Sequence, residues 1–597
     1  MAVICCADGG EEMERWTILR KGADFERIGK KFRISPRLAC LIRNRDIVGD
    51  EEVRQYLYGT LADLYDGGLM KDMDRAVRIL KEKIQGKKKI RVIGDYDSDG
   101  VNSAYILSSA LKRLGADADT DIPDRMKDGY GLNVRLIEKA HEDGIDTILT
   151  CDNGIAAKEE IRYGKSLGMT VIVTDHHEVP FEEGDEGKCF ILPPADAVVD
   201  PKREDCPYPF KGLCGAAVAY KLAEKVYESF GRETGEIEDL IENVAIATVT
   251  DVMELVGENR IFVREGLKRI RFTENPGLRA LLACTGTEEK EIGYYHAGFV
   301  IGPCLNAGGR LATAKQALRL FETEDKEEAL RLAEGLKELN EERKDMTEKA
   351  VDEGTDIIES TDVGKDKVLL LYLQDCHESI AGIVAGRIRE RFHKPAFVLT
   401  DAVQEAKGSG RSIEAYHMYE ELNRCSEYLT KFGGHKLAAG FSLKKEYIGL
   451  LRQKLNENCV LTEEEMAEKV VIDMEMPFSC VTEELIRELE LLEPCGNGNK
   501  KPVFARRNAA ILSGRVLGKN GNVLRLRMDD TTASVEAVYF GDMGEFSACL
   551  EEKYGKGAWE EMLRGRKRDM ELTVTYYPKI NEYQGRRSVQ IVITHYK

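Results

Sequence analysis

Short apolar strands alternate with amphipathic helices from about residue 88 to about residue 205, and this alternation constrains the fold more than any other feature. The segments typical of strands read KKIRVIGDYD, DTILTCDNG, TVIVTDHHE and DAVVDPK. Segments with a helical apolar period separate them, among them GVNSAYILSSALKRLG and AKEEIRYGKSLG. Because strands that are joined by helices run parallel, this region predicts an α/β domain built on an open parallel sheet.

Acidic residues follow three of these strands. The first strand ends in three aspartates at every second position, the next in one, and a third in an Asp-His-His triplet; they are Asp95, Asp97, Asp99, Asp152, Asp175, His176 and His177. The carboxyl ends of neighbouring parallel strands converge in one crevice. We therefore expect four of these residues to meet in space: Asp95, Asp97, Asp152 and His176.

Carboxylates crowded in this way cannot all stay ionised without a counter-charge, and divalent cations resolve the conflict. Oxygen ligands with one or two imidazoles suit Mn²⁺ or Mg²⁺ better than Zn²⁺. Asp251 and Glu254, on or near a helix end, extend the acidic set. Taken singly, an aspartate after a strand is a turn residue or a helix N-cap, as Asp99 before Gly100 could be. The recurrence of such residues at every strand end favours a metal centre.

Composition restricts the class of protein. A chain of 597 residues is too long to fold around one hydrophobic core, and its length indicates about three to five domains. The sequence has no membrane-spanning apolar run and no signal-peptide pattern at its start. Its 15 cysteines include no CxxC pair, which is typical of a protein from a reducing cytosol. The net charge of −19 is uneven, since residues 495–597 carry 18 Lys+Arg against 12 Asp+Glu, a local +6. A basic terminal region is compatible with a polyanionic partner.

The rest of the chain divides by pattern into five parts. We expect an N-terminal extension over 1–45, the first α/β domain over 46–324, a long connecting helix over 325–360, a second α/β domain over 361–460 and a β-domain over 461–597. Asn520-Gly521 between two alternating segments is a strong hairpin signal. The basic, tyrosine-bearing strands fit an OB-type β-barrel, and a purely structural β-domain is the alternative.

These motifs resemble the DHH phosphoesterase superfamily, named for the triplet that stands here as Asp175-His176-His177. DYDSDG, CDNG and TDVMEL match the other core motifs of the superfamily. Further segments resemble the RecJ family of single-stranded-DNA exonucleases, namely PDRMKDGYGLN, YPFKGLCGAAVAYKL and IGPCLNAGGRL. CHESIAGIVAGRI, GSGRS and FGGHKLAAG are similar to the DHH-associated domain, and LEPCGNGNKKPVF to the start of the OB domain of the family. The resemblance covers about residues 50 to 597.

The resemblance implies roles for individual residues. Asp95 and Asp97 would each ligate one metal ion, Asp152 would serve both, and His176 and Asp251 would complete the second site. Asp175 would orient a neighbouring ligand and His177 would face the substrate phosphate. The implied phosphate-binding residues are Arg125, Asn306, Arg310, Ser409, Arg411 and His435. The chain departs from the family at Cys304, where an arginine is usual.

The resemblance implies an exonuclease that acts on single-stranded DNA from the 5′ end, uses two Mn²⁺ or Mg²⁺ ions and releases mononucleotides. Recombination and repair in the cytoplasm would be its setting, with a helicase and a single-stranded-DNA-binding protein as partners and a monomer as its form. A groove between the two α/β domains, too narrow for duplex, would select single strands. Three alternatives are a phosphodiesterase for short oligonucleotides or cyclic dinucleotides, a non-catalytic scaffold, and a β-barrel interaction module.

Overall fold

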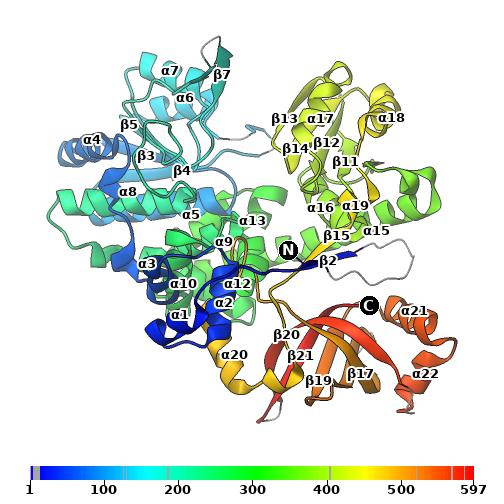
Figure 1. Cartoon of the computed structure of the whole chain (residues 1–597). Helices are drawn as coiled ribbons and strands as arrows, with labels where there is room; N and C mark the ends of the chain where they lie inside the picture. The colour runs from blue at the N-terminus through cyan, green and yellow to red at the C-terminus, as the bar shows by residue number, and fades with distance from the viewer. Residues whose placement is uncertain are drawn as a thin grey trace. The chain divides into compact units, whose positions relative to one another are not determined.

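A computed structural model describes residues 2–3, 14–125, 127–129, 131–184, 187–402, 405–518, 521–565, 569–583 and 585–597 (Figure 1). The chain forms two compact units. One unit is continuous, from Thr60 to Met466, and the other combines Met1–Gly59 with Ala467–Lys597. Among the described helices, none is both long enough and apolar enough to span a bilayer.

The larger unit contains the predicted parallel sheet. Its five strands lie in the order β4-β3-β5-β6-β9, and every pairing is parallel. Their bounds are β3 (Lys89–Ile93), β4 (Asp117–Asp121), β5 (Thr147–Cys151), β6 (Thr170–Thr174) and β9 (Ala197–Val199). Sheets of this kind are covered by helices on both faces, which explains the nearly continuous apolar strands in the sequence.

Alternate residues of these strands enter two separate cores. Val92 and Leu149 pack with α4 (Met73–Gln85), α5 (Ser98–Arg113) and α8 (Gly215–Ser229) on one face. Ile93 and Ile148 pack with α6 (Val134–Glu142) and α7 (Lys158–Ser166) on the other. The sheet is therefore a buried layer between helices, and its carboxyl-end loops are the part free to carry chemistry (Figure 1).

A group of helices follows the sheet and extends the first core. It includes α9 (Ile241–Thr250), α10 (Gly257–Ile270), α11 (Pro276–Cys284), α13 (Gly302–Leu311) and α14 (Lys315–Glu322). The predicted connecting helix is α15 (Lys326–Ser360), with the Asp325 side chain as its N-cap. Helix α15 packs on α11, α13 and α14 and then on α16 (Ala381–Phe392). It therefore links the first α/β domain to the second.

The second α/β domain is built on a mixed sheet in the order β10-β11-β12-β14-β13. Its strands are β10 (Leu369–Tyr372), β11 (Ala396–Asp401), β12 (Ala406–Arg411), β13 (Lys431–Gly434) and β14 (Ala438–Leu443). Only β10 and β11 pair in parallel; the other described pairings are antiparallel. Helix α16 packs on β11 and β12. One face of the sheet is covered in this way.

The second unit joins the two ends of the chain. Strand β2 (Glu14–Ile18) pairs in parallel with β15 (Glu468–Ile472). Helices α1 (Phe25–Phe32), α2 (Pro36–Asn44) and α3 (Asp50–Tyr58) share a core with the C-terminal strands. We expected the N-terminal extension to end at residue 45, whereas residues up to Gly59 belong to this unit. The difference arises because Val53 and Leu57 of α3 pack in the same core as Phe504.

The C-terminal strands form a six-stranded sheet in the order β16-β17-β18-β19-β21-β20, and β17 also pairs with β20. Their bounds are β16 (Met474–Glu475), β17 (Phe504–Leu517), β18 (Val523–Asp529), β19 (Ser534–Phe540), β20 (Glu571–Tyr583) and β21 (Arg586–Tyr596). Strands β17 and β18 are antiparallel partners, as the hairpin signal predicted. Gly521 has a φ of 64° in the connection, and Asn520 lies outside the described residues.

A fully buried ion pair joins α8 to α10 and provides a test of this packing. Lys221 Nζ lies 2.9 Å from Glu258 Oε1, and both side chains are 0% exposed. The Tyr208 hydroxyl donates to Glu258 Oε2 at 2.6 Å. Lys221→Met leaves the Glu258 carboxylate buried without its cation, so we expect the free energy of unfolding to fall by about 3–5 kcal/mol in urea titrations.

The matched control is Lys268→Met on the surface of α10. Lys268 pairs with Glu265 at 2.9 Å, but its side chain is 64% exposed. Exposed pairs of this kind contribute about 0–1 kcal/mol. If both substitutions lower the free energy of unfolding equally, the buried pair stabilises the fold no more than an exposed pair does.

Candidate active site

The acidic residues lie at the carboxyl edge of the parallel sheet, where the strand order reverses. Strands β3 and β5 are neighbours there, although β4 comes between them in the sequence. Asp95 follows β3, Asp152 follows β5, and Asp175 and His176 follow β6. Ligands of open α/β sheets bind at such a switch point. The sheet therefore brings these residues to one place, as the sequence analysis expected.

The three aspartates of DYDSDG have three different environments. Asp97 is the N-cap of α5, and its Oδ1 accepts from the backbone N–H of Asp99 at 3.0 Å and of Gly100 at 3.1 Å. The alternative that Asp99 caps this helix is therefore excluded, because Asp99 lies in the first turn. The Asp99 carboxylate instead accepts from the backbone N–H groups of Gly215 and Ala216, at 2.7 and 2.8 Å, at the start of α8.

His176 is the centre of a cluster of carboxylates, of which those of Asp99 and Asp152 are buried. Its Nε2 lies 3.0 Å from Asp152 Oδ1, 3.5 Å from Asp99 Oδ2 and 3.8 Å from Asp251 Oδ2. Asp251 is the C-cap of α9, so this helix supplies a carboxylate to the sheet edge. The ligand atoms of Asp99, His176 and Asp251 all lie within 4.8 Å of one another, as do those of Asp152, His176 and His177. Either group could hold a metal ion.

Asp95 is fully buried beside this cluster. Its Oδ1 accepts from the backbone N–H of Gly131 at 3.2 Å, and its Oδ2 has no hydrogen-bond partner among the described residues. A buried carboxylate oxygen without a partner is costly, and a cation is the ligand that removes the cost. The donor set of oxygens and one imidazole therefore fits a hard divalent cation.

The pKa values of the aspartates show the same unfavourable crowding of negative charge. Burial raises the pKa of Asp95 to about 8, with the charge of Asp97 adding to the effect. Burial and Asp97 raise the pKa of Asp99 to about 6. The pKa values of Asp152 and Asp251 lie well above the ordinary range, because both are buried and both face Asp99 and Asp97. These carboxyl groups ionise together only when a positive charge lies among them.

The two histidines have opposite charge states. Burial lowers the pKa of His176 to about 3, assisted by the charge of His177, so its ring is neutral, as a metal ligand must be. Burial would also lower the pKa of His177, but the hydrogen bond and charge of Asp175 raise it to about 9. His177 Nδ1 lies 2.7 Å from Asp175 Oδ1, and its side chain is 42% exposed. His177 is thus a cation at neutral pH.

Asp175 holds this loop in place. Its Oδ1 accepts from the backbone N–H of His176 at 2.8 Å, and its Oδ2 accepts from that of Ile155 at 2.9 Å. Asp152 is held in a strained backbone conformation, with φ of 60°. A Cβ atom at Gly215 would lie 2.6 Å from Asp152 Cβ, so only glycine permits this approach. Backbone contacts therefore fix both residues before any ligand binds.

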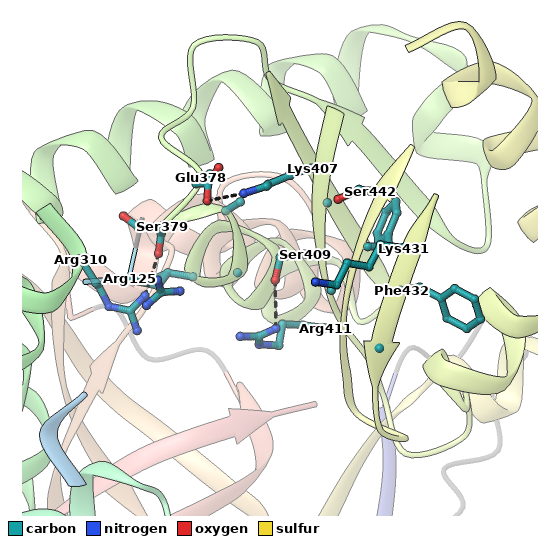
Figure 2. A pocket seen from close by; sticks show the side chains of 17 residues that line it. Arg125, Arg310, Glu378, Ser379, Lys407, Ser409, Arg411, Lys431, Phe432 and Ser442 are labelled. Atoms are coloured by element: carbon teal, nitrogen blue, oxygen red, sulfur yellow. Dashed lines mark hydrogen bonds and ion pairs between the residues drawn. The ribbon is translucent and has the colours of Figure 1, made fainter. Parts of the chain in front are cut away.

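A second feature of the larger unit is a cationic cleft of about 420 Å³ (Figure 2). Five cationic side chains line it against a single anionic one, Glu378, which pairs with Lys407 at 3.0 Å; the cations are Arg125, Arg310, Lys407, Arg411 and Lys431. Figure 2 shows Arg125 and Arg310 on one side, Ser409 and Arg411 in the middle, and Lys431 with Phe432 on the other side. The excess of positive charge is typical of a phosphate-binding surface.

The cleft adjoins the acidic cluster through the turn after β3. The Arg125 guanidinium lies 5.0 Å from the ring centroid of Tyr96, between Asp95 and Asp97 in the chain. Arg310 Nη1 donates to the Ser379 carbonyl at 2.7 Å and so joins the first α/β domain to the second. Burial lowers the pKa of Arg310 to about 10, and neighbouring Arg125 contributes. Two arginines therefore lie close enough for their charges to repel each other, which favours an anion there.

The glycines of GSGRS lie in the sheet of the second α/β domain. This segment is the central strand β12, with antiparallel neighbours on both sides. A Cβ atom at Gly408 would lie 2.3 Å from the Phe441 ring, and one at Gly410 2.5 Å from Met418 Sδ. These glycines make room for core side chains. The alternate residues Lys407, Ser409 and Arg411 line the cleft.

Glycines of the neighbouring strands form the floor of the cleft. Gly440 of β14 lies opposite Ser409 and Gly433 of β13, and all three line the cleft. A Cβ atom at Gly433 would meet nothing within 4 Å, and one at Gly440 only the Gly408 carbonyl at 3.9 Å. The missing side chains leave space above the floor for a bulky anion.

Two of the predicted phosphate-binding residues do not line the cationic cleft. Asn306 Oδ1 accepts from the backbone N–H of Ser98 at 2.8 Å, so its side chain supports the Asp97 turn. His435 is exposed at the end of β13 and is not among the residues that line the cleft.

Cys304 is 2% exposed and receives a hydrogen bond from Asn340 of α15 at 3.5 Å. Cys304 is therefore a core residue here.

Asp99 was named among the strand-end acids without a role as a metal ligand, and the fold places it 3.5 Å from His176. Two further site residues were not predicted from the sequence. Lys407 and Lys431 line the cleft, but a surface lysine gives no signal until the strand pairing is known. The period of two through Lys407, Ser409 and Arg411 could have indicated the first of them.

The raised carboxyl pKa values predict how Mn²⁺ affects stability. Asp95 has a pKa of about 8 in the folded chain, against about 3.9 for an unfolded aspartate. Without metal the folded chain holds the extra proton, so its stability falls as pH rises from about 4 to about 8. Because Mn²⁺ replaces that proton, we expect it to raise Tm more at about pH 8 than at about pH 5.5. Thermal melts with and without Mn²⁺ measure this, and an equal shift at both pH values would contradict it.

Comparison with known proteins places these features in a family. Three family models match: the DHH family, N-terminal domain, over residues 89–248, the DHHA1 domain over 365–460 and the RecJ OB domain over 472–595. The matched segments correspond to the first α/β domain, the second α/β domain and the C-terminal sheet. They confirm the predicted fold class.

Curated relatives match almost the whole chain. "Single-stranded-DNA-specific exonuclease RecJ" of Bacillus subtilis is 35% identical over 586 residues, which is 97% of this chain and 70% of that protein. The protein of the same name from Escherichia coli is 31% identical over 589 residues, covering 94% of this chain and 95% of that protein.

Solved structures agree. The crystal structure of RecJ with Mn²⁺ from Thermus thermophilus matches with a TM-score of 0.79 at 27% identity, over 98% of this chain and 79% of that one. A structure of exonuclease RecJ bound to manganese matches with a TM-score of 0.55 at 33% identity, over 65% of this chain and 94% of that one. Sequence identity, coverage and fold therefore lead to one conclusion: the chain belongs to the RecJ family of DHH phosphoesterases.

Proposed function

We propose that this protein is a metal-dependent exonuclease that hydrolyses phosphodiester bonds of single-stranded DNA from the 5′ end and releases mononucleotides. One observation carries the proposal: a cluster of carboxylates around the buried His176 adjoins a cleft lined by five cations. The cluster suits a cation and the cleft suits a phosphate. The relatives from Bacillus subtilis and Escherichia coli, both named as single-stranded-DNA-specific exonucleases, support the same substrate.

The proposed metal ligands lie at the sheet edge; they are Asp95, Asp97, Asp152, His176 and Asp251, with Asp99 added because of its contact with His176. Bound Mn²⁺ or Mg²⁺ ions, two in this proposal, supply positive charge for the scissile phosphate and lower the pKa of an attacking water. The protein contributes a fixed geometry. Asp152 is held by the close approach of Gly215, and Asp175 holds the two histidines.

Other residues act on the substrate phosphates in this proposal. His177 is a partly exposed imidazolium beside the cluster, suited to stabilise negative charge as the bond breaks. Arg125, Arg310, Ser409 and Arg411 would bind the phosphate at the strand end. Anchoring that phosphate at a fixed distance from the cluster is what would make the product a mononucleotide. Asn306 supports the turn at Asp97, and His435 would act at the rim of the cleft.

Domain organisation supports DNA rather than a small substrate. We assign catalysis to the domain that ends at residue 324, substrate binding to residues 361–460 and strand capture to residues 461–597. Residues 495–597 carry a local charge of +6 and the OB match, which an enzyme for cyclic dinucleotides would not need. The family resemblance supports recombination and repair in the cytoplasm as the setting, a helicase and a single-stranded-DNA-binding protein as partners, and a monomeric form.

The first test removes one carboxylate charge from the cluster. Asp152→Asn keeps the size of the side chain but weakens the site that holds the cations, so cleavage of end-labelled single strands with Mn²⁺ should fall by about 10³-fold or more. Single-strand binding should persist, because the cleft and the OB region are unchanged; fluorescence anisotropy measures it. Cleavage near the wild-type rate would remove Asp152 from the catalytic machinery.

The second test concerns the strand end. Arg411→Met should weaken binding of 5′-phosphorylated strands by about tenfold or more, since a charge-assisted hydrogen bond to phosphate contributes about 1.5–3 kcal/mol. Strands with a 5′-hydroxyl should bind nearly as they do to the wild type. Arg391→Met is the matched control, because Arg391 pairs with Glu359 on the outer surface and its side chain is 53% exposed. Equal loss for both strand ends would exclude Arg411 as a terminal phosphate ligand.

A further inference from the structure

We propose that a second cavity of the larger unit, lined by α5, α9 and α10, binds a linear polyamine, and that this cation acts as an effector of the acidic cluster. The inference goes beyond the proposed function, because binding in this cavity needs neither DNA nor the chemical step. It assigns a ligand class and a route of regulation to residues that the exonuclease mechanism does not use.

The second cavity is larger than the cationic cleft, with a volume of about 890 Å³. Its walls come from α5, the short helix η3 (Thr234–Leu240), α9, α10 and the connection from α10 to α11. Two aromatic side chains line it, Tyr105 of α5 and Phe272, which is 76% exposed. A cavity of this size suits an organic molecule.

The lining of the second cavity is acidic. Five carboxylates line it against three basic side chains. Each basic side chain already has a carboxylate partner within 3 Å; the pairs are Arg113–Asp239, Lys268–Glu265 and Arg269–Glu238. The negative charge that these pairs leave in excess favours a cationic ligand.

Glu242 is the only one of the five carboxylates that is buried. It is 7% exposed, and no ion pair to it occurs among the described residues. Burial raises the pKa of Glu242 to about 7; a hydrogen bond from Thr273 opposes the shift, and the charge of Asp239 adds to it. A buried carboxylate without a counter-charge is costly, and an ammonium group beside it offsets that cost.

The carboxylates of the second cavity are too far apart to hold a metal ion together. None of them belongs to the groups of described side chains whose ligand atoms lie within 4.8 Å of one another. Ammonium groups joined by methylene chains can reach separate carboxylates, and the methylenes can pack on the rings of Tyr105 and Phe272. These are the properties of a linear polyamine.

Buried hydrogen bonds connect the second cavity to the acidic cluster. Asn243 of α9 lines the cavity, and its Nδ2 donates to Asn102 Oδ1 of α5 at 2.8 Å. Asn102 Nδ2 donates to the carbonyl of Ser98 at 2.6 Å, and Ser98 directly follows Asp97. Asn243, Asn102 and Ser98 are 5%, 0% and 1% exposed, so water does not compete for these hydrogen bonds.

The two helices that carry these hydrogen bonds also reach the cluster. Asp97 is the N-cap of α5, and Asp251 is the C-cap of α9. A rise of about 1.5 Å per residue puts Asp251 roughly 12 Å from Asn243 along α9. A ligand that holds Glu242 and Asn243 in place therefore stabilises the arrangement in which Asp97 and Asp251 face the metal site. The polyamine should tighten Mn²⁺ binding, and Mn²⁺ should tighten polyamine binding by the same factor.

The first test measures spermidine binding to the full chain by isothermal titration calorimetry, without DNA and with Mn²⁺ present to occupy the acidic cluster. We expect one spermidine per chain. Glu242→Gln keeps the size of the side chain and removes its charge, so the affinity should fall about tenfold or more. Butylamine, which has a single ammonium group, should bind the wild type at least about tenfold more weakly than spermidine.

The matched control for Glu242→Gln is Glu359→Gln. Glu359 pairs with Arg391 on the outer surface, and its side chain is 57% exposed. This substitution removes the same charge from the chain but leaves the second cavity unchanged, so spermidine should bind as it does to the wild type.

The second test titrates Mn²⁺ with and without spermidine. We expect spermidine to lower the Kd of Mn²⁺ about fivefold or more in the wild type and to leave it unchanged in Glu242→Gln. Asn243→Ala removes the hydrogen bond to Asn102 but keeps Glu242 in the cavity. This variant should bind spermidine nearly as the wild type does and lose the effect on Mn²⁺.

The outcomes are distinct. Equal spermidine affinity of the wild type and Glu242→Gln would overturn the inference, because the ligand would then bind elsewhere on the acidic surface. Bound spermidine without a change in the Kd of Mn²⁺ would overturn the effector role. Failure of the wild type to bind Mn²⁺ would contradict the proposed function, whereas the affinity of Glu242→Gln for spermidine would still decide the polyamine site.

Discussion

Electrostatic repulsion among buried carboxylates at one edge of a parallel sheet is the constraint on which the rest of the structure depends. Strands β3, β5 and β6 and helix α9 each deliver acidic groups there because of the strand order. The chain offsets part of the cost with backbone donors, as at Asp99, which accepts two N–H groups from the start of α8. The electrostatic repulsion that the backbone donors do not offset is removed when protons or divalent cations bind.

The same unit joins this negative site to a positive one. Helix α13 carries Asn306, which supports the turn at Asp97, and Arg310, which lines the cleft and donates to Ser379 of the second domain. Helix α15 packs on both domains. A phosphodiester chain needs both sites, because its terminal phosphate requires cations from the protein while its scissile phosphate requires bound metal ions. In the proposed function, the link between the two sites would set the length of the product to one nucleotide.

Much of this arrangement could be predicted from the sequence. Alternating strands and helices predicted the parallel sheet, and the acids at strand ends predicted where Asp152 and His176 meet.

The details depended on contacts between distant segments, which the sequence does not display. Asp99 became a neighbour of His176 only through α8, and Asn306 became a support for Ser98 only through α13. The glycines of β12 fit Phe441 and Met418 and not an anion, which no local pattern could distinguish. Residues 46–59 joined the C-terminal unit through a shared core.

Anomalous diffraction at the manganese edge, from crystals of the wild-type protein soaked in Mn²⁺, tests the central claim most directly. The account predicts two peaks about 3.5–4 Å apart, in contact with carboxylate oxygens of Asp95 and Asp152 and with His176 Nε2. A cluster without manganese density, or manganese bound only at other positions of the chain, would contradict it.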